Sequence, residues 1–276
     1  MNRSVRVLAV LAVLAVMLSA AGCNKLKARD QLNKGVQAYK NQNYEQAIEH
    51  FKNAINDDPQ LLNAKIYLAT AYDNQFVPGN DDKANLAYAQ LAIDEFKAVL
   101  ASDPKNTAAE KGIASIYFNM KKFDEAKTHQ RNVIAIDPND PEAYYTIGVI
   151  DWTQSYGPRQ EIRNGLHMKP TDSITDKKAC ATVRAKNSAN VEDGLTVLQK
   201  AIQLRSDYED AMAYLNLMYR ERADYECEDK DARADDLKKA DEWQDKTLAT
   251  KKEKEDKANQ QAGGIVMDKD KEQEKQ

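Results

Sequence analysis

Apolar and small residues recur along the chain at helical spacing, in runs that end at a proline. In residues 43–59, NYEQAIEHFKNAINDDP, Ala47, Phe51 and Ala54 are separated by four and three positions, and Pro59 follows five positions later. Spacings of three and four place side chains on one face of a helix, and proline ends a helix because it has no backbone N–H to donate. This stretch therefore predicts an amphipathic helix with one packed face.

The same steps recur three more times, the last time in a weaker form. The further sets are Ala92, Phe96, Val99 and Pro104; Ala126, Gln130, Val133 and Pro138; and Gly194, Leu198, Ala201 and Ser206. A helix marked by a small residue precedes each set, at Gly35, Ala69, Ala114 and Gly148. These small residues are 34, 45 and 34 positions apart, and 45 is 34 + 11, so the chain repeats with a period of 34 and carries insertions.

Short motifs on the first helix of successive repeats share one layout: LATAY (68–72), IASIY (113–117) and LNLMY (215–219). With the second-helix motifs YEQAIEHFKNAINDDP and FDEAKTHQRNVIAIDP, they resemble the tetratricopeptide repeat family over about residues 28–250. The resemblance implies an all-α fold, a right-handed α-solenoid of about five helix pairs, in which stacking of neighbouring pairs completes the core. The expected repeats are about 28–61, 62–106, 107–140, 141–208 and 209–250.

Two insertions fall between the first and second helices of repeats two and four. The first carries a Pro-Gly turn and is expected to lengthen the next helix backwards from about Asp81. The second, residues 153–189, is expected to be mixed loop and short helix. A polar helix from about Asp231 suits the capping helix that a solenoid needs. The charged residues 251–276 predict a fraying helix and then disorder.

The N-terminus has the layout of a secretory signal. Two arginines precede an apolar run, residues 7–17, which is shorter than the roughly 20 residues that span a bilayer. Its end, LSAAGC, resembles the lipobox of bacterial lipoproteins, which implies a signal peptide over 1–22 and lipidation of Cys23 before a short linker, 23–27. The resemblance further implies a lipid anchor in the bacterial envelope, in the outer membrane facing the periplasm. An uncleaved signal anchor is the alternative.

Charge and the absence of known motifs argue against nucleic-acid binding, catalysis and metal or cofactor binding. The formal net charge is −4, and no basic cluster stands out, so nucleic acid is not an expected partner. The three histidines lie outside zinc-binding motifs, and neither a nucleophile elbow nor a phosphate loop is present. The sequence thus predicts no catalytic residues, no metal site and no cofactor.

Two cysteines remain if Cys23 is lipidated. Cys180 lies in the turn insertion of repeat four, and Cys227 lies in the corresponding turn of repeat five. Adjacent repeats place such turns side by side, and an exported protein can hold disulfides. We therefore expect a Cys180–Cys227 disulfide; two free thiols are the alternative.

The family resemblance also implies where a partner would bind, because first helices line the concave groove of such solenoids. The residues at matching positions are Tyr39, Ile66, Tyr67, Asn74, Lys111, Phe118, Asn119, Tyr145, Trp152, Tyr214, Leu217 and Arg220. Aromatic side chains supply large contact areas at low entropic cost, which suits protein or peptide binding. Alternatively, several of these residues serve only to pack one repeat on the next.

The favoured hypothesis is a non-catalytic, lipid-anchored scaffold or adaptor that binds another protein or peptide at the cell envelope. The rival is a small-ligand or glycan-binding lipoprotein, in which the repeat-four insertion closes a pocket around Trp152 and Tyr156.

Overall fold

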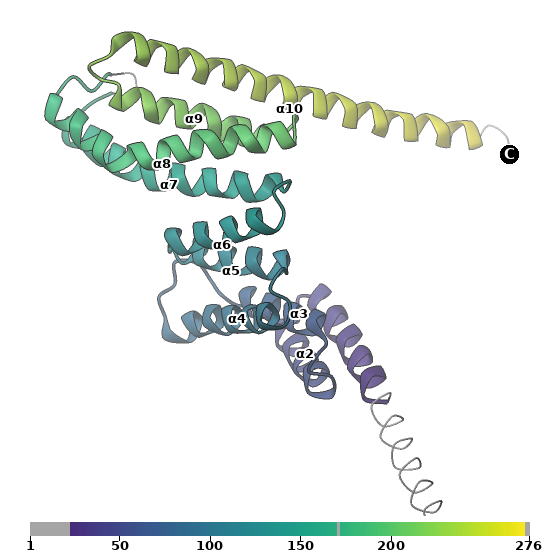
Figure 1. Cartoon of the computed structure of the whole chain (residues 1–276). Helices are drawn as coiled ribbons and strands as arrows, with labels where there is room; N and C mark the ends of the chain where they lie inside the picture. The colour runs from purple at the N-terminus through teal and green to yellow at the C-terminus, as the bar shows by residue number, and fades with distance from the viewer. Residues whose placement is uncertain (1–22, 170–171, 274–276) are drawn as a thin grey trace, which may run out of the picture. The chain divides into compact units, whose positions relative to one another are not determined.

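The computed structural model describes residues 23–169 and 172–273, with side chains through residue 260. Within this range the chain forms helices joined by turns and loops, without a β-strand (Figure 1). Residues 23–40 are helical and precede α2 (Tyr44–Asp57), α3 (Leu62–Asp73), α4 (Lys83–Ser102), α5 (Thr107–Asn119), α6 (Phe123–Ile136), α7 (Pro141–Gly165), α8 (Lys177–Leu204), α9 (Glu209–Tyr225) and α10 (Lys230–Gln273). The predicted all-α class is confirmed.

The chain divides into two compact units, Met1–Asn132 and Val133–Gln276. In the first unit, α2 packs on α3, α3 on α4 and α4 on α5. In the second, α7 packs on α8, α8 on α9 and α9 on α10, while α7 also contacts α9. Helices therefore pack mainly on their neighbours in sequence, which is how a repeat protein completes its core.

Small residues allow the helices of a pair to approach closely. A Cβ atom on Gly35 would lie 2.4 Å from Cε1 of Phe51, and one on Gly148 would lie 2.4 Å from Cγ of Leu198. Phe51 and Leu198 are both fully buried. The glycines marked by the sequence period thus leave the space that a large core side chain fills.

Polar residues begin the helices in a recurrent way. Five helices have an Asn or Asp N-cap whose side chain accepts a hydrogen bond from a backbone N–H of the first turn: Asn43, Asp82, Asn106, Asp140 and Asp176. Such caps satisfy donors that a helix start leaves without a partner. Asp82, Asp140 and Asp176 therefore stabilise the start of the helix that follows each of them.

The two insertions behave differently. Helix α4 begins at Lys83, close to the expected Asp81. The repeat-four insertion is more helical than the mixed loop and short helix expected: α7 continues through Pro158 to Gly165, and α8 begins at Lys177. Within the insertion, Arg159 and Arg163 of α7 form ion pairs with Glu221 and Asp224 of α9, which hold this part of α7 against α9.

The C-terminal segment, residues 251–276, is predicted to be a fraying helix and then disordered. In the described residues α10 continues to Gln273. Charges of opposite sign recur four positions apart here, as in Lys251 and Glu255, and such pairs support a helix.

At the other end, the expected signal peptide, residues 1–22, lies outside the described residues. Cys23 is exposed and not disulfide-bonded. In the part of the chain that the structure describes, none of the helices combines the length and apolar character needed to cross a bilayer.

Candidate functional site

A row of aromatic rings runs between α7 and α9 in the second unit. The ring centroids of Tyr208 and Tyr145 lie 5.0 Å apart, those of Tyr145 and Tyr214 5.8 Å, those of Tyr214 and Trp152 5.5 Å, and those of Trp152 and Tyr156 4.9 Å. On α7 the rings are seven and four positions apart, which keeps them on one helix face. Three predicted groove residues, Tyr145, Trp152 and Tyr214, are thus brought together.

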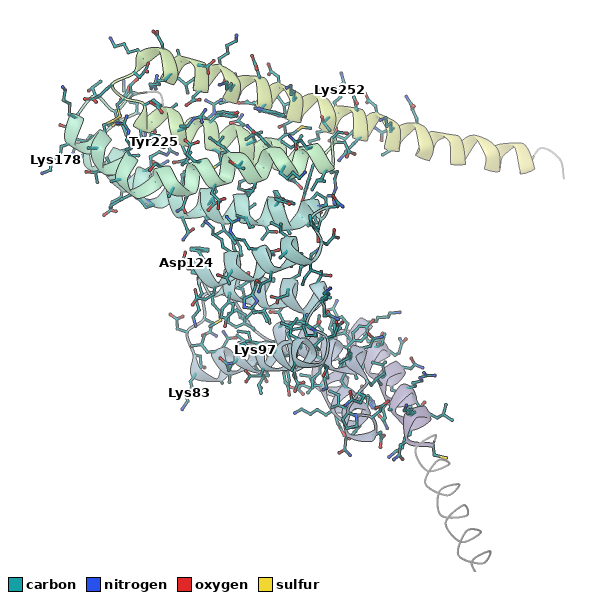
Figure 2. All side chains as sticks on the ribbon, in the orientation of Figure 1. Lys83, Lys97, Asp124, Lys178, Tyr225 and Lys252 are labelled. Carbon is teal, nitrogen blue, oxygen red and sulfur yellow. A yellow bond between two sulfur atoms is a disulfide. The ribbon has the colours of Figure 1, made fainter. Side chains whose placement is uncertain are left out.

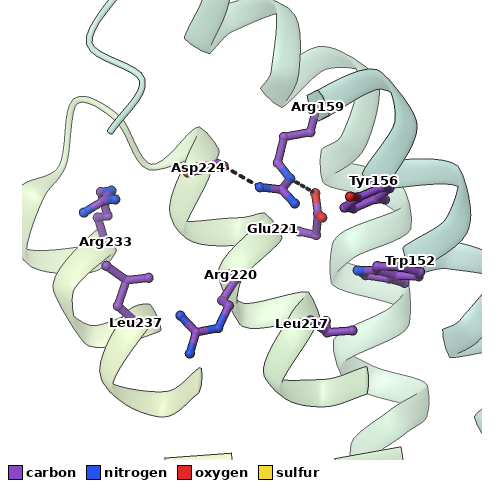
Figure 3. Close-up of a pocket in the computed structure, with 9 residues that line it drawn as sticks. All are labelled: Trp152, Tyr156, Arg159, Leu217, Arg220, Glu221, Asp224, Arg233 and Leu237. Carbon is purple, nitrogen blue, oxygen red and sulfur yellow. Dashed lines mark hydrogen bonds and ion pairs between the residues drawn. The ribbon is translucent and has the colours of Figure 1, made fainter. Parts of the chain in front are cut away.

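A cavity of about 280 Å³ opens at one end of this row (Figure 3). Its lining comes from α7, α9 and α10 and comprises Trp152, Tyr156, Arg159, Leu217, Arg220, Glu221, Asp224, Arg233 and Leu237. Leu217 and Arg220 also line a second cavity, of about 310 Å³, between α9 and α10. Three predicted groove residues, Trp152, Leu217 and Arg220, therefore face open space as well as their packing neighbours.

Buried charges form the inner wall of the first cavity. Arg159 Nε lies 2.8 Å from Glu221 Oε2, and Arg159 also donates to Asp224 Oδ2 at 2.9 Å. Arg163 donates to the same Asp224 oxygen at 3.0 Å. The two arginines are four positions apart on α7 and the two acids three apart on α9, so each pair shares a helix face. The carboxylates of this wall are therefore balanced by arginines.

Burial dominates the titration of Glu221, whose residue is 0% exposed. Loss of hydration raises its pKa to about 7, although the positive charge of Arg159 acts in the opposite direction. Tyr145, in the aromatic row, has its pKa raised to about 12 by burial and by Tyr214. Burial is thus the main cause of both pKa shifts.

Arg220 lies on the more open side of the cavity. Its Nε donates to Asn216 Oδ1 at 3.0 Å, and its NH2 group donates to Asp241 Oδ1 at 2.7 Å and to Gln244 Oε1 at 3.2 Å. Asp241 and Gln244 belong to α10. The predicted capping helix thus covers part of the α9 face that carries the predicted groove residues.

The predicted groove residues of the first unit fall into smaller groups. Asn74 Nδ2 donates to Tyr39 Oη at 2.8 Å, which joins two of them directly. Tyr67 is 38% exposed and stacks on Phe51, with ring centroids 5.5 Å apart. Ile66 is half-buried against the core of this unit. Tyr67 and Ile66 thus contact the core of this unit, and their place in a binding groove stays a prediction.

The other three predicted residues lie on α5. Phe118 meets the ring of Phe123 edge to face at 5.8 Å, and Lys111 is half-buried. Asn119 lines a cavity of about 380 Å³ beside the repeat-two insertion, which contributes Gly79. This cavity is more polar than the one in the second unit, and none of the predicted aromatic residues lines it.

A disulfide joins Cys180 to Cys227, with Cα atoms 6.1 Å apart. It connects the first turn of α8 to the turn after α9, at the end of the second unit where Figure 2 labels Lys178 and Tyr225. Arg184 supports the same junction, because its NH2 group donates to the Tyr225 carbonyl at 2.6 Å. Cys227, one end of the disulfide, lies three positions after Asp224, which lines the cavity.

Sequence reasoning missed the charged half of the cavity. Arg159 and Arg163 lie in the insertion that was expected to be partly loop, so their shared helix face was not visible. The sequence predicts the helix from about Asp231 only as a capping helix, which assigns no binding role to Arg233 or Leu237. A signal was available in the spacing of Glu221 and Asp224, which suits one helix face, but their partners could not be inferred without the path of α7.

The described residues offer little to metal chemistry, since no group of three or more His, Cys, Asp or Glu side chains in them could hold an ion. His50 and His129 instead make matching contacts in the first unit. His50 Nδ1 lies 2.8 Å from Gln31 Oε1, and His129 Nδ1 lies 2.5 Å from Glu110 Oε2. Both pairs are separated by 19 positions, so the contact recurs with the repeat.

Comparison with known proteins agrees with this architecture. Residues 88–148 match the tetratricopeptide repeat family. A crystal structure of MamA protein is similar at 15% identity with a TM-score of 0.53, covering 81% of this chain and 94% of that one. MamA from Desulfovibrio magneticus RS-1 (residue 41 to its end) is similar at 18% identity and a TM-score of 0.53, covering 82% and 96%. The predicted tetratricopeptide solenoid is confirmed as the fold class, and the comparisons support a tetratricopeptide repeat protein.

One relative is similar in sequence over a shorter stretch. It is a DnaJ homolog subfamily C member 7 homolog from Dictyostelium discoideum, 26% identical over 117 residues, which are 40% of this chain and 22% of the relative. This chain therefore matches less than a quarter of that protein's length. Tetratricopeptide repeats generally serve as scaffolds for protein–protein interaction rather than as catalysts.

Proposed function

We propose that this protein is a non-catalytic scaffold or adaptor that is lipid-anchored at Cys23 in the bacterial envelope and binds a protein or peptide partner. The observation that carries the binding role is the aromatic row that ends in an open cavity beside Leu217 and Arg220. Aromatic and arginine side chains around a desolvated pocket are the features of interface hot spots. The anchor is supported by the lipobox-like LSAAGC before an exposed Cys23.

The binding role is tested with a photo-crosslinking amino acid placed at Leu217, in cells that contain the full-length chain. The control position is Gln203, which is exposed on α8 and absent from the cavity lining. A partner protein should be captured from Leu217 and not from Gln203. Equal capture from both positions, or none from either, would contradict the proposed groove.

The anchor has a separate test. Labelled fatty acid should be incorporated into the wild-type chain and not into Cys23→Ser, and only the wild-type chain should fractionate with the outer membrane. Incorporation of the fatty acid into both the wild-type protein and Cys23→Ser would contradict lipidation at Cys23.

A second candidate function is binding of a small ligand or glycan in the same cavity. It is favoured by Trp152 and Tyr156, which line the cavity, the latter from the helical part of the repeat-four insertion. Titration calorimetry with envelope glycans distinguishes it, because saturable binding that Trp152→Ala abolishes would support the ligand role. No heat of binding would leave the protein-binding role as the better account.

A further inference from the structure

The Arg233 side chain differs from that of Arg159, whose buried Nε also lacks a hydrogen bond but lies 2.8 Å from Glu221 Oε2. The Arg233 Nε is buried and has no hydrogen-bond partner among the described residues. A buried donor that belongs to a charged group and lacks an acceptor is costly, and native structures usually satisfy it with water, an ion or a ligand. Arg233 lines the cavity from α10, so its side chain borders the space that a ligand would occupy (Figure 3).

Arg220 is a second cationic group that a ligand can engage. Its ion pair with Asp241 lies at the surface, with side chains 38% and 69% exposed. Exposed pairs of this kind contribute little, so a ligand can replace Asp241 at small cost. Arg159 is not available to a ligand in this way, because it forms ion pairs with both Glu221 and Asp224 in the cavity wall.

The charge balance of the lining favours an anion. Three arginines and two acids line the cavity, and Arg163 adds a further positive charge behind Asp224. Because Arg159 and Arg163 already balance Glu221 and Asp224, Arg233 is left without a carboxylate partner among the described residues, and the partner of Arg220 is the exposed Asp241.

The remaining lining is apolar. Leu217 and Leu237 lie on the α9 and α10 sides, and Trp152 projects from α7 opposite them (Figure 3). The volume of about 280 Å³ lies at the lower end of the range for ligand pockets, which suits a side chain or a small organic acid.

From these observations we propose that the cavity binds a carboxylate attached to an apolar body. Arg220 and Arg233 contact the carboxylate, and Leu217, Leu237 and Trp152 contact the body. The carboxylate belongs either to an acidic residue beside an apolar one in a partner segment or to a free organic acid. In the first case the inference rests on the proposed function and identifies the part of the partner that is anchored.

The test uses the full-length chain carrying Trp243→Phe, which leaves Trp152 as the sole tryptophan. Its emission is titrated with 4-phenylbutyrate, with 4-phenylbutyramide as the uncharged match, and with acetylated Leu-Glu and Leu-Gln dipeptide amides. The acids should bind saturably and at least about tenfold more tightly than their amide counterparts, the difference expected for a charge-assisted hydrogen bond. Equal affinity for acid and amide, or no binding by either acid, overturns the proposal.

Substitutions of Arg233 and Arg220 test whether these two side chains contact the carboxylate. Arg233→Gln and Arg220→Gln should each weaken acid binding by about tenfold or more, whereas Arg233→Lys should retain part of it. Lys238→Gln is the matched control, because it removes a positive charge from α10 at a position that is 76% exposed and outside the lining. Unchanged affinity in Arg233→Gln, with an unchanged melting temperature, contradicts the proposed contact.

The two probes separate the sources. Binding of the dipeptide but not of 4-phenylbutyrate indicates a partner segment, and the reverse indicates a free acid; both support the carboxylate site. If a partner crosslinks at Leu217 while neither acid binds, this inference fails and the proposed function stands. If the acids bind and no partner crosslinks, the proposed function fails and the cavity assignment stands.

Discussion

Arg159 Nε lies 2.8 Å from Glu221 Oε2 in the wall of the cavity, and the two side chains are 14% and 1% exposed. A buried ion pair is not by itself a large source of stability, but removal of one partner leaves the other charge buried and uncompensated. The pair therefore fixes α7 against α9 at the place where the groove residues meet.

Arg159→Met should consequently destabilise the second unit by about 3–5 kcal/mol, the cost of leaving Glu221 alone. The double variant Arg159→Met with Glu221→Leu should recover most of that loss. Urea unfolding, monitored by tryptophan emission, measures the unfolding free energy of each variant, because both tryptophans lie in the second unit. A double variant that is less stable than Arg159→Met would contradict the account.

The same carboxyl predicts a pH dependence of stability. Burial raises the pKa of Glu221 to about 7, so between the ordinary glutamate value and about 7 the folded state holds a proton that the unfolded chain has lost. Stability should therefore fall as pH rises through this window, by roughly 3 kcal/mol, and level off above it.

Glu221 is faced by Arg159 and Arg163 from α7 and by Asp224 on its own helix, while Arg220 of α9 and Arg233 of α10 line the same cavity. Glu221→Gln should remove the slope while all these groups remain. Asp241→Asn, at an exposed position on α10, should keep it. An identical slope in Glu221→Gln and the wild-type protein would show that another group titrates.

The disulfide should stabilise the second unit. Its two cysteines are 47 positions apart, and closing a loop of that size constrains the unfolded chain by about 4 kcal/mol in the chain-entropy account. Cys180→Ser with Cys227→Ser should lower the unfolding free energy by that amount. A reductant should bring the wild-type protein to the same value and leave the double variant unchanged; two reactive thiols in the unreduced wild-type chain would contradict the bond.

Close helix approach predicts a contrast between two glycines of α7. Gly148→Ala should destabilise by about 1–3 kcal/mol, because the new methyl group would lie 2.4 Å from Cγ of Leu198. Gly157→Ala is the control, since nothing lies within 4 Å of its added Cβ, and it should stabilise by about 0.5–1 kcal/mol through helix propensity. Equal effects of both substitutions would show that Gly148 has room for a side chain.

The repeat period was sufficient to predict the helix pairing and half of the cavity. Gly148 is one of the small residues that mark the repeat period, and Trp152, Leu217 and Arg220 follow from their places on first helices. These positions are determined by local periodicity, which a single sequence displays.

The other half depends on structure that breaks the period. Arg159 lies in an insertion, and its helical conformation depends on packing of α7 against α9. Arg233 reaches the cavity because α10 covers α9, and no repeat pattern fixes that crossing. Contacts of this kind are tertiary, so the spacing of residues along the chain does not reveal them.

The central claim is that the second unit binds a protein partner through Trp152 and Leu217. Its most direct test is the affinity of the partner captured at Leu217 for the wild-type protein, for Trp152→Ala and for Leu217→Ala, with Leu91→Ala as the control at an exposed apolar position. The account predicts that each cavity variant weakens binding by roughly 30-fold, as expected at an interface hot spot, and that Leu91→Ala leaves it unchanged. Affinity unchanged in both cavity variants, with the fold intact, would contradict it.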